Sequence, residues 1–270
     1  MENKKVLAMV ESAVMIALAT VLSLLKLAEL PAGGSVTFAS MLPIVLISYR
    51  HGTKYGLAAG AVYGVIQQLL GLKNLSYVTG FASVLAVILL DYAFAFALIG
   101  LGGFWRRVAG TGRTAAVAGG ITACLCRYLC HVFSGATVWA GLSIPSEEAL
   151  LFSFSYNATY MLPETVITAV VLFYLTENLD FAAPSLTRRA SEAQSGRSPA
   201  MKIAAGGVVV AAVIYDTLAV FSRLQASDGT FDVTLLSWGD LLWPGIVTAA
   251  AAVIALVLLL LGRKAKGKAE

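Results

Sequence analysis

The sequence predicts an all-α polytopic membrane protein, built as a six-helix bundle that is followed by two additional C-terminal transmembrane helices. Hydrophobic residues make up 59% of the 270-residue chain and charged residues only 13%, whereas soluble domains carry about 25% charged residues. The apolar residues lie in long runs, and a helix of roughly 20 apolar residues spans a bilayer. This pattern excludes an ordinary soluble protein. The net charge of +4 is not gathered on one face, so it does not indicate nucleic-acid binding.

Eight apolar segments provide the expected spans, at residues 6–27, 36–49, 55–72, 77–103, 114–141, 149–175, 203–221 and 241–261. The first run is long and lacks a small-residue cleavage site, so we expect a retained span rather than a signal peptide. A segment rich in Ser, Pro, Arg and Ala follows the sixth run. We therefore divide the chain into a six-helix membrane domain at 1–176, a cytoplasmic linker at 177–202, and two extra helices with a basic tail at 203–270.

Lysine and arginine residues occupy alternate connections and both termini, while the intervening connections hold only Lys26, Lys73 and Arg223. Cytoplasmic loops of membrane proteins carry an excess of these residues. We therefore expect both termini in the cytoplasm and an even number of spans. The loops AELPAGG, KNLS and IPSEE then lie outside.

Small residues recur at four-residue intervals in two of the expected spans. Ala13 and Ala17 share one face of the first span, and Gly56, Gly60 and Gly64 share one face of the third. Such faces let helices approach closely in lipid. The alanine pair either docks a partner helix or packs inside the bundle, and spacing alone favours internal packing.

Three ionisable residues are expected near the bilayer midplane. Asp91, Arg127 and Glu164 each lie about 13 to 15 residues from the ends of their spans, at about 1.5 Å per residue. Buried charges in membranes pair with one another, so we expect Arg127 to pair with Glu164 or Asp91. The alternative is that this trio only holds helices together.

Further polar and aromatic residues are expected nearer the outer face. Arg127, His131 and Trp139 share one helical stripe, and Asn157 shares another with Glu164. Two facing stripes can line a cavity that opens outward. The alternatives are a hydrogen-bonded core histidine and a tryptophan that anchors the helix at the interface.

Such a cavity suits a flat, polar ligand, including a cationic one. Trp139 and Phe152 offer faces for stacking and cation–π attraction, worth about 0.5–2 kcal/mol. Asp91 can supply countercharge, while His131 and Asn157 can fix orientation. A Gly-rich phosphate loop and a GxSxG elbow are both missing from the sequence. An intramembrane enzyme with His131 and Asp91 as acid and base is a less favoured alternative, because no nucleophile motif accompanies them.

Cys124, Cys126 and Cys130 lie in one apolar segment. Their spacing fits no zinc motif, and a buried free cysteine usually behaves as a small hydrophobic residue. We therefore expect no metal site and no cofactor.

Several motifs in register resemble the thiamine-specific substrate-binding (S) components of energy-coupling factor transporters. They are LPAGGSVTFASMLPIVLISYRHG (30–52), LDYAFAF (90–96), RYLCH (127–131) with the later Trp139, and YNATYMLPE (156–164). The resemblance covers roughly residues 4–175. It implies a protein of the bacterial cytoplasmic membrane that captures thiamine from outside and is not itself an enzyme. Import would require a transmembrane coupling subunit and two ATP-hydrolysing subunits, which alone would use ATP.

The resemblance also assigns roles to residues. The acidic ligand for the aminopyrimidine falls on Asp91, beside Tyr92, with His131 assisting. The stacking tryptophan falls on Trp139 and the asparagine ligand on Asn157. The small-residue motif that meets the coupling module falls on Ala13 and Ala17, which favours the docking interpretation of that pair.

This chain departs from the family pattern at four places. Asp91 stands where the family typically has glutamate, and Phe152 where it has a tyrosine. The family has a second tryptophan in the loop after the fifth span, and this chain has none there, around Ile144. No tryptophan occurs in residues 28–36 either. The ligand could therefore be thiamine or a related pyrimidine. A solitary carrier, with the extra helices in place of the coupling module, is the alternative transport mode.

Overall fold

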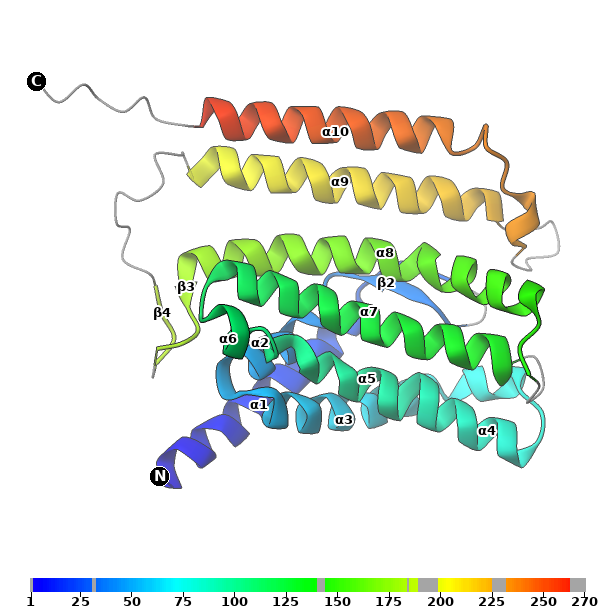
Figure 1. Ribbon diagram of the computed structural model, residues 1–270, viewed down its shortest axis with the longest axis horizontal. Coiled ribbons are helices and arrows are strands. Elements are labelled where there is room, and N and C mark those ends of the chain that lie inside the picture. Colours follow the sequence, from blue (N-terminus) through cyan, green and yellow to red (C-terminus); the bar gives the residue numbers. More distant parts are fainter. Residues whose placement is uncertain are drawn as a thin grey trace, which may run out of the picture.

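The computed structural model describes residues 2–30, 33–139, 144–183, 185–188, 199–224 and 232–262. In Figure 1 the long helices lie side by side, and the predicted all-α membrane fold is confirmed. Six helical segments of the described chain are long and apolar enough to cross a membrane. They are Lys4–Leu24, Phe81–Ala109, Arg113–Thr137, Glu147–Asn178, Ala200–Leu224 and Leu242–Leu261.

The predicted transmembrane helix at residues 36–49 is wrong. Strand β2 (Ser35–Thr37) and the 10-residue helix α2 (Leu42–His51) occupy this stretch. At 1.5 Å per residue, α2 reaches about half of the roughly 30 Å hydrocarbon layer. Irregular backbone at membrane depth is tolerated where protein surrounds it, and all residues of α2 from Leu42 to Tyr49 are buried.

The first part of the bundle consists of α1 (Glu2–Leu24), the β1–β2 hairpin and helices α2 and α3 (Thr53–Leu70). Strand β1 (Lys26–Glu29) pairs antiparallel with β2, with Glu29 opposite Ser35. Gly33 in the hairpin turn has a φ of 103°, a conformation that glycine adopts without strain. The predicted outer loop at 28–34 therefore connects two paired strands.

The fourth transmembrane segment changes its helical form along its length. It contains α4 (Phe81–Val87), the π-helical η2 (Ile88–Phe94), α5 (Ala95–Ala97), the 3₁₀ segment η3 (Leu98–Gly103) and α6 (Arg106–Ala109). A short 3₁₀ helix, η1 (Leu72–Tyr77), precedes it. π-Helical turns occur frequently at functional sites, and here the π-helical turn carries Asp91.

Helices α7 (Arg113–Thr137) and α8 (Glu147–Asn178) form the other wall of the bundle. The Ser146 side chain caps α8 by accepting a hydrogen bond from the Ala149 amide at 3.1 Å. Glycine permits the backbones to touch, because a Cβ on Gly119 of α7 would lie 1.8 Å from the Gly102 carbonyl oxygen. The predicted glycine face of the third span is confirmed, since a Cβ on Gly56 would lie 2.7 Å from the Gly100 carbonyl oxygen.

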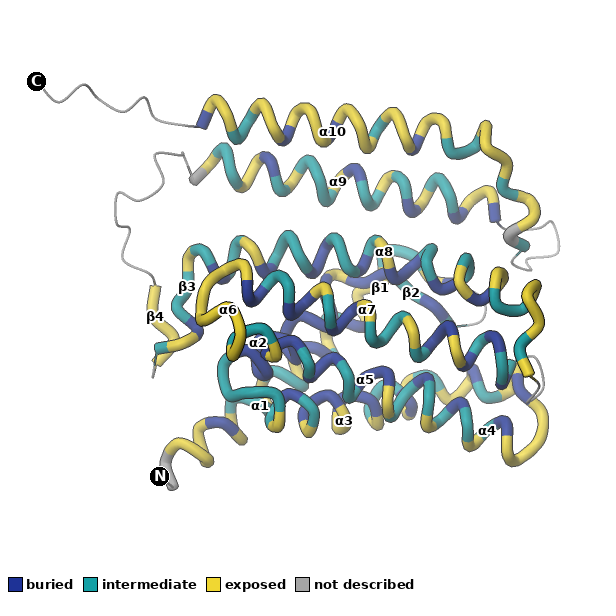
Figure 2. Tube along the Cα trace, viewed as in Figure 1, coloured by how far each residue is buried: buried dark blue, intermediate teal, exposed yellow. Residues whose placement is uncertain are grey.

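The extra helices α9 (Pro199–Leu224) and α10 (Leu242–Leu261) form an antiparallel hairpin beside α8, with the 3₁₀ turn η4 (Val233–Leu235) near their connection. Figure 2 shows that buried residues concentrate around α2 and β2, while α10 is mostly exposed. In Figure 1 the hairpin lies on the opposite side of the bundle from α1.

The first and last described residues, Glu2 and Gly262, lie at the same end of the bundle. The start of α1, the end of α10 and the short strands β3 (Leu179–Asp180) and β4 (Thr187–Arg188) gather there in Figure 1. Arg50 joins these parts, because its Nε lies 2.5 Å from Glu11 Oε2 and its Nη1 lies 2.9 Å from the Ala183 carbonyl oxygen. This arrangement agrees with an even number of crossings.

Candidate functional site

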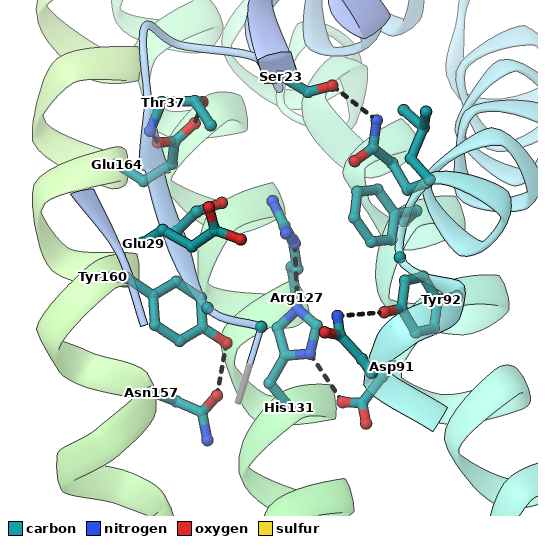
Figure 3. Close-up of a pocket in the computed structure, with 18 of the residues that line it drawn as sticks. Ser23, Glu29, Thr37, Asp91, Tyr92, Arg127, His131, Asn157, Tyr160 and Glu164 are labelled. Atoms are coloured by element: carbon teal, nitrogen blue, oxygen red, sulfur yellow. Dashed lines mark hydrogen bonds and ion pairs between the residues drawn. The ribbon is translucent and has the colours of Figure 1, made fainter. Parts of the chain in front are cut away.

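One cavity of about 460 Å³ lies within the bundle, lined by η2, α7 and α8 on one side and by α1, α3 and the β1–β2 hairpin on the other. All six residues predicted to bind substrate line it: Asp91, Tyr92, His131, Trp139, Phe152 and Asn157. Arg127 and Glu164 also line the cavity, and Figure 3 shows Arg127 between the Asp91–His131 pair and Glu164. The predicted residues therefore meet at one cavity, although Trp139 lies in the turn after α7, which ends at Thr137, rather than on a helical stripe with His131.

Asp91 is the acceptor of three side-chain hydrogen bonds. His131 Nδ1 lies 2.8 Å from Asp91 Oδ1, and Ser134 Oγ lies 2.5 Å from Oδ2. Trp139 Nε1 donates to Oδ2 at 3.0 Å. Asp91 itself is 9% exposed. This carboxylate is oriented by its neighbours and faces the cavity.

The predicted ion pair of Arg127 with Glu164 or Asp91 is not formed in the described structure. Arg127 Nε instead donates to His131 Nε2 at 3.1 Å, and its guanidinium lies over the Phe96 ring at 4.2 Å from the ring centroid. Depth along a helix places the three charges at one level but leaves their direction around each helix undetermined. An aromatic face and an imidazole are the neighbours found here.

Glu164 fastens the β1–β2 hairpin to α8. Its carboxylate accepts hydrogen bonds from the Thr37 amide at 2.7 Å, from Thr37 Oγ1 at 2.6 Å and from Ser40 Oγ at 3.4 Å. Glu164 is 2% exposed, so these hydrogen bonds take the place of hydrogen bonds from water to its carboxylate. Hydrogen bonds of this kind are what make a buried carboxylate tolerable.

Asn157 belongs to a polar row on α8. Its Nδ2 donates to the Ser153 carbonyl oxygen at 2.8 Å, and its Oδ1 accepts from Tyr160 Oη at 2.6 Å. Figure 3 shows the Asn157–Tyr160 pair beside His131. The amide is thereby held with a fixed orientation at the cavity wall.

Aromatic rings stand at two places around the cavity. Trp139 and Tyr77 have ring centroids 6.4 Å apart with an interplanar angle of 31°. Phe152 and Tyr156 stack with centroids 6.0 Å apart at 19°. Both pairs can hold a flat ring against their faces, and aromatic faces attract cations.

Several lining residues come from segments that the sequence indicated only as loops, among them Glu29, Lys73 and Asn74. Asn74 Nδ2 donates to Tyr92 Oη at 3.0 Å, whereas its Oδ1 is buried without a hydrogen-bond partner in the described structure. The polar residues of the KNLS loop were the available signal for this contribution. Their approach to the cavity depends on the fold of the hairpin, since Gly33 packs directly on Asn74.

A small ionic cluster joins the hairpin to η1 at the outer end of the cavity. Glu29 Oε1 lies 2.9 Å from Lys26 Nζ and 3.1 Å from Lys73 Nζ. The hydrogen bond from Lys26, with that from Lys73, holds the pKa of the Glu29 carboxyl below its ordinary value. The side chains of Lys26 and Lys73 are 37% and 71% exposed, so solvent screens these pairs.

The remaining predicted residues lie outside the cavity lining. Ala13 and Ala17 are exposed on α1, so they do not pack inside the bundle. Ile144 is 94% exposed, away from any described aromatic pair. The thiols of Cys124, Cys126 and Cys130 are free.

Comparisons with known proteins agree with this architecture. The model of the thiamine transporter protein family (Thia_YuaJ) matches residues 9–182. The thiamine transporter ThiT of Bacillus subtilis strain 168 is 36% identical over 185 residues, which cover 64% of this chain and 92% of that protein. ThiT of Lacticaseibacillus paracasei is 27% identical over 142 residues, which cover 49% and 68% of the two chains.

A solved structure of ThiT from Listeria monocytogenes has the same fold, with a TM-score of 0.52 and 23% sequence identity over 65% of this chain and 96% of that one. The family match ends at residue 182, so helices α9 and α10 lie beyond it. A match of this extent, to a family of transporters rather than enzymes, places the protein in a bacterial cytoplasmic membrane as a multi-pass protein. The chain belongs to the thiamine transporter protein family.

Proposed function

We propose that this protein is the substrate-binding membrane subunit of a vitamin uptake system, which captures thiamine from the outside for ATP-driven import by an energy-coupling factor module. The observation that carries the proposal is the shared cavity, where Asp91, His131, Trp139 and Asn157 meet in about 460 Å³. Drug-sized ligands occupy cavities of about 300–1,000 Å³. The family to which the chain belongs supports the choice of thiamine.

The chemistry of thiamine fits this lining in two ways. Its thiazolium ring carries a permanent positive charge, for which Asp91 is a buried countercharge and the Trp139 ring offers a face for cation–π attraction. Its aminopyrimidine ring presents an amine and ring nitrogens. Asp91, the acidic ligand that the resemblance assigns to this ring, can accept from the amine, and Asn157 and Tyr92 can meet the remaining polar atoms. A buried polar site rejects analogues that leave these groups unpaired.

The orientation of the cavity supports capture from outside. Lys26 and Lys73 stand in the two loops that the distribution of basic residues places outside, and both line the cavity. Glu164 and Arg127 lie about halfway along α8 and α7, at the deeper end of the cavity. A ligand that enters from the outer surface therefore passes the ionic cluster before it reaches Asp91.

Coupling to a separate module is supported by the free face of α1. Ala13 and Ala17 are exposed there, and the α9–α10 hairpin lies across the bundle from this face. The extra helices thus leave the small-residue ridge open for a partner helix, which such ridges accept closely.

Titration of the purified chain with thiamine tests the binding claim, with quenching of tryptophan fluorescence as the signal. We expect saturable quenching at micromolar thiamine or below, which corresponds to about −8 kcal/mol or tighter. Trp139→Phe should remove most of the quenching. The matched control is Trp238→Phe, because Trp238 is 89% exposed near the start of α10 and should leave the titration unchanged. Absence of saturable quenching in the unmodified chain would refute the proposal.

Uptake into vesicles tests the coupling claim. Thiamine should accumulate only when the coupling subunit, both ATP-hydrolysing subunits and ATP are present. Ala17→Trp should reduce this uptake while binding persists, whereas Ala250→Trp on the exposed face of α10 should not. Accumulation by the chain alone would instead identify a solitary carrier.

A further inference from the structure

Arg127 occupies a position that its charge does not explain. It is the permanently charged residue at the deep end of the cavity, yet it forms no ion pair in the described structure, and its side chain donates a hydrogen bond to His131 and lies over the Phe96 ring. The guanidinium group has only donors and does not lose its proton in proteins. Its partner atom must therefore be an acceptor.

This requirement determines the protonation of His131. Arg127 Nε lies 3.1 Å from His131 Nε2, so that nitrogen must present its lone pair and carries no proton. The other ring nitrogen, Nδ1, lies 2.8 Å from Asp91 Oδ1, and a carboxylate acts as the acceptor. His131 is consequently a neutral imidazole with its proton on Nδ1.

The helix supplies the geometry for this chain of contacts. Arg127 and His131 are four residues apart on α7, so their side chains lie on one face, one turn apart. Phe96 lies beneath the guanidinium and is itself held by an edge contact with Tyr63, with ring centroids 5.3 Å apart. The direction of the Arg127 donor is thus set by packing from two other segments.

We propose that Arg127 is a positioning residue that keeps His131 neutral and Nδ1-protonated, so that Asp91 remains available as countercharge for a cationic ligand. A doubly protonated His131 would form its own ion pair with Asp91 and would compete with that ligand. This inference rests on the proposed thiamine function for its consequence in binding, although the proton position concerns the ligand-free protein alone.

Other ionisable groups around the cavity do not contact the imidazole in this way. The charged groups that line the cavity with His131 are Asp91, Arg127, Glu164, Glu29, Lys26 and Lys73. Tyrosines from η2 and α8 also face it, and they are Tyr92, Tyr156 and Tyr160. Of these, Tyr160 meets the ring edge-on at 6.1 Å between centroids, and Glu164 is bonded to Thr37 and Ser40. Arg127 is therefore the group that controls Nε2.

The direct test is nitrogen NMR of the ligand-free chain labelled with ¹⁵N-histidine. The chain has two histidines, so His131→Asn identifies the His131 signals. We expect the Nδ1-protonated neutral form at about pH 7 and also at about pH 6, where an ordinary histidine with a pKa of about 6.5 is mostly charged. A proton on Nε2, or a charged ring at pH 7, would overturn the proposal whether or not thiamine binds.

The functional test is the pH profile of thiamine binding by Arg127→Met. Without the Arg127 donor, Nε2 of His131 is free to bind a second proton, so the thiamine affinity of this variant should fall between pH 8 and pH 6 if only the neutral form binds. The unmodified chain should stay nearly constant, and Arg127→Met combined with His131→Asn should lose the pH dependence.

Two further variants separate this role from general effects of charge or packing. Lys54→Met removes an exposed positive charge on α3 that lies outside the cavity lining, and its pH profile should follow that of the unmodified chain. Arg127→Lys keeps a donor and should restore a flatter profile than Arg127→Met. Equal pH profiles for the unmodified chain and Arg127→Met would overturn the proposal. A wholly non-binding unmodified chain would instead refute the proposed function and leave the NMR result to decide this inference.

Discussion

The α1–α8 bundle and the α9–α10 hairpin treat an intramembrane aspartate in different ways. Asp91 in the bundle accepts hydrogen bonds from three side chains and lines the cavity. Asp216, about 12 Å from the end of α9 at 1.5 Å per residue, accepts a hydrogen bond from Thr248, while its Oδ1 is buried without a partner among the described residues. Convergence of several donors, rather than an acid at membrane depth, therefore marks the proposed binding site.

The two regions also differ in packing. Glycines of the bundle bring backbones into contact, as at Gly119 against Gly102. On α9, Gly206 instead packs against the Tyr174 side chain of α8, and a Cβ on Gly207 would meet no atom within 4 Å. The hairpin attaches through larger side chains, and Phe221 is 7% and Leu224 is 1% exposed. The bundle is thus a close-packed domain that encloses the cavity, and the hairpin is a helix pair that packs on α8.

Replacing each aspartate separately by asparagine should give the largest difference in thiamine affinity between the two regions. Asp91→Asn removes the countercharge and puts an amide donor among three donors. Hydrogen bonds to charged groups contribute about 1.5–3 kcal/mol, so we expect about 100-fold weaker thiamine binding in a fluorescence titration. Asp216→Asn should change the affinity less than about twofold, since α9 contributes nothing to the described cavity lining. Similar losses for both variants would break the comparison.

Alanine substitution at glycine tests the packing contrast. Gly119→Ala places a Cβ 1.8 Å from the Gly102 carbonyl oxygen, so α7 and η3 must separate. Overpacking typically costs about 1–3 kcal/mol, which thermal unfolding in detergent would show as a lower midpoint. Gly207→Ala adds a methyl group in open space and should be neutral or slightly stabilising, because alanine favours helix by about 1 kcal/mol over glycine. A large loss in the second variant would mean that α9 packs more tightly than described.

Removal of the hairpin should have a smaller effect on binding. The described cavity lining comes entirely from residues 23–164, so a chain that ends after residue 188 should bind thiamine within about threefold of the full chain, or about 0.7 kcal/mol. The unfolding midpoint should fall, because the core surface covered by Phe221 becomes exposed. Loss of saturable binding despite a folded bundle would show that α9 and α10 contribute to the site.

The convergence of Asp91, His131, Trp139 and Asn157 could be predicted because helical spacing gives both depth and face. The partner of Arg127 could not, because its direction depends on how η2 and α5 pack around α7. The π-helical form of Ile88–Phe94 changes the direction of Asp91 in a way that hydropathy does not reveal. The trio of charges at one depth therefore forms two sets of contacts: Asp91 and Arg127 are linked through His131, and Glu164 bonds to Thr37 and Ser40.

The stretch at residues 36–49 shows a second limit of sequence reasoning. An apolar run can be a transmembrane helix or a segment enclosed by protein, and hydropathy is similar for both. Here Thr37 and Ser40 bond to Glu164, which lies more than a hundred residues later in the chain. Only the fold brings these polar groups together. Their hydrogen bonds to Glu164 satisfy the polar groups that precede the short helix α2 in the chain.

The ionic cluster at Glu29 should give the smallest effect, and its pH dependence has a defined sign. Because its lysine partners lower the pKa of Glu29 in the folded state, the stabilisation is present above the ordinary value of about 4.3 and is lost as pH falls through the lowered folded value. The exposed lysines limit this contribution to a few tenths of a kcal/mol. Glu29→Gln should therefore lower the unfolding midpoint slightly at about pH 7 in low salt, with no difference at about pH 3 or in high salt.

The matched change in the α9–α10 region is Asp240→Asn. Its partner Arg223 lies 3.4 Å away and has a side chain that is 65% exposed. If both variants lose the same small amount, the cluster is an ordinary surface pair. A salt-sensitive loss at Glu29 alone would show that it fastens the hairpin to η1.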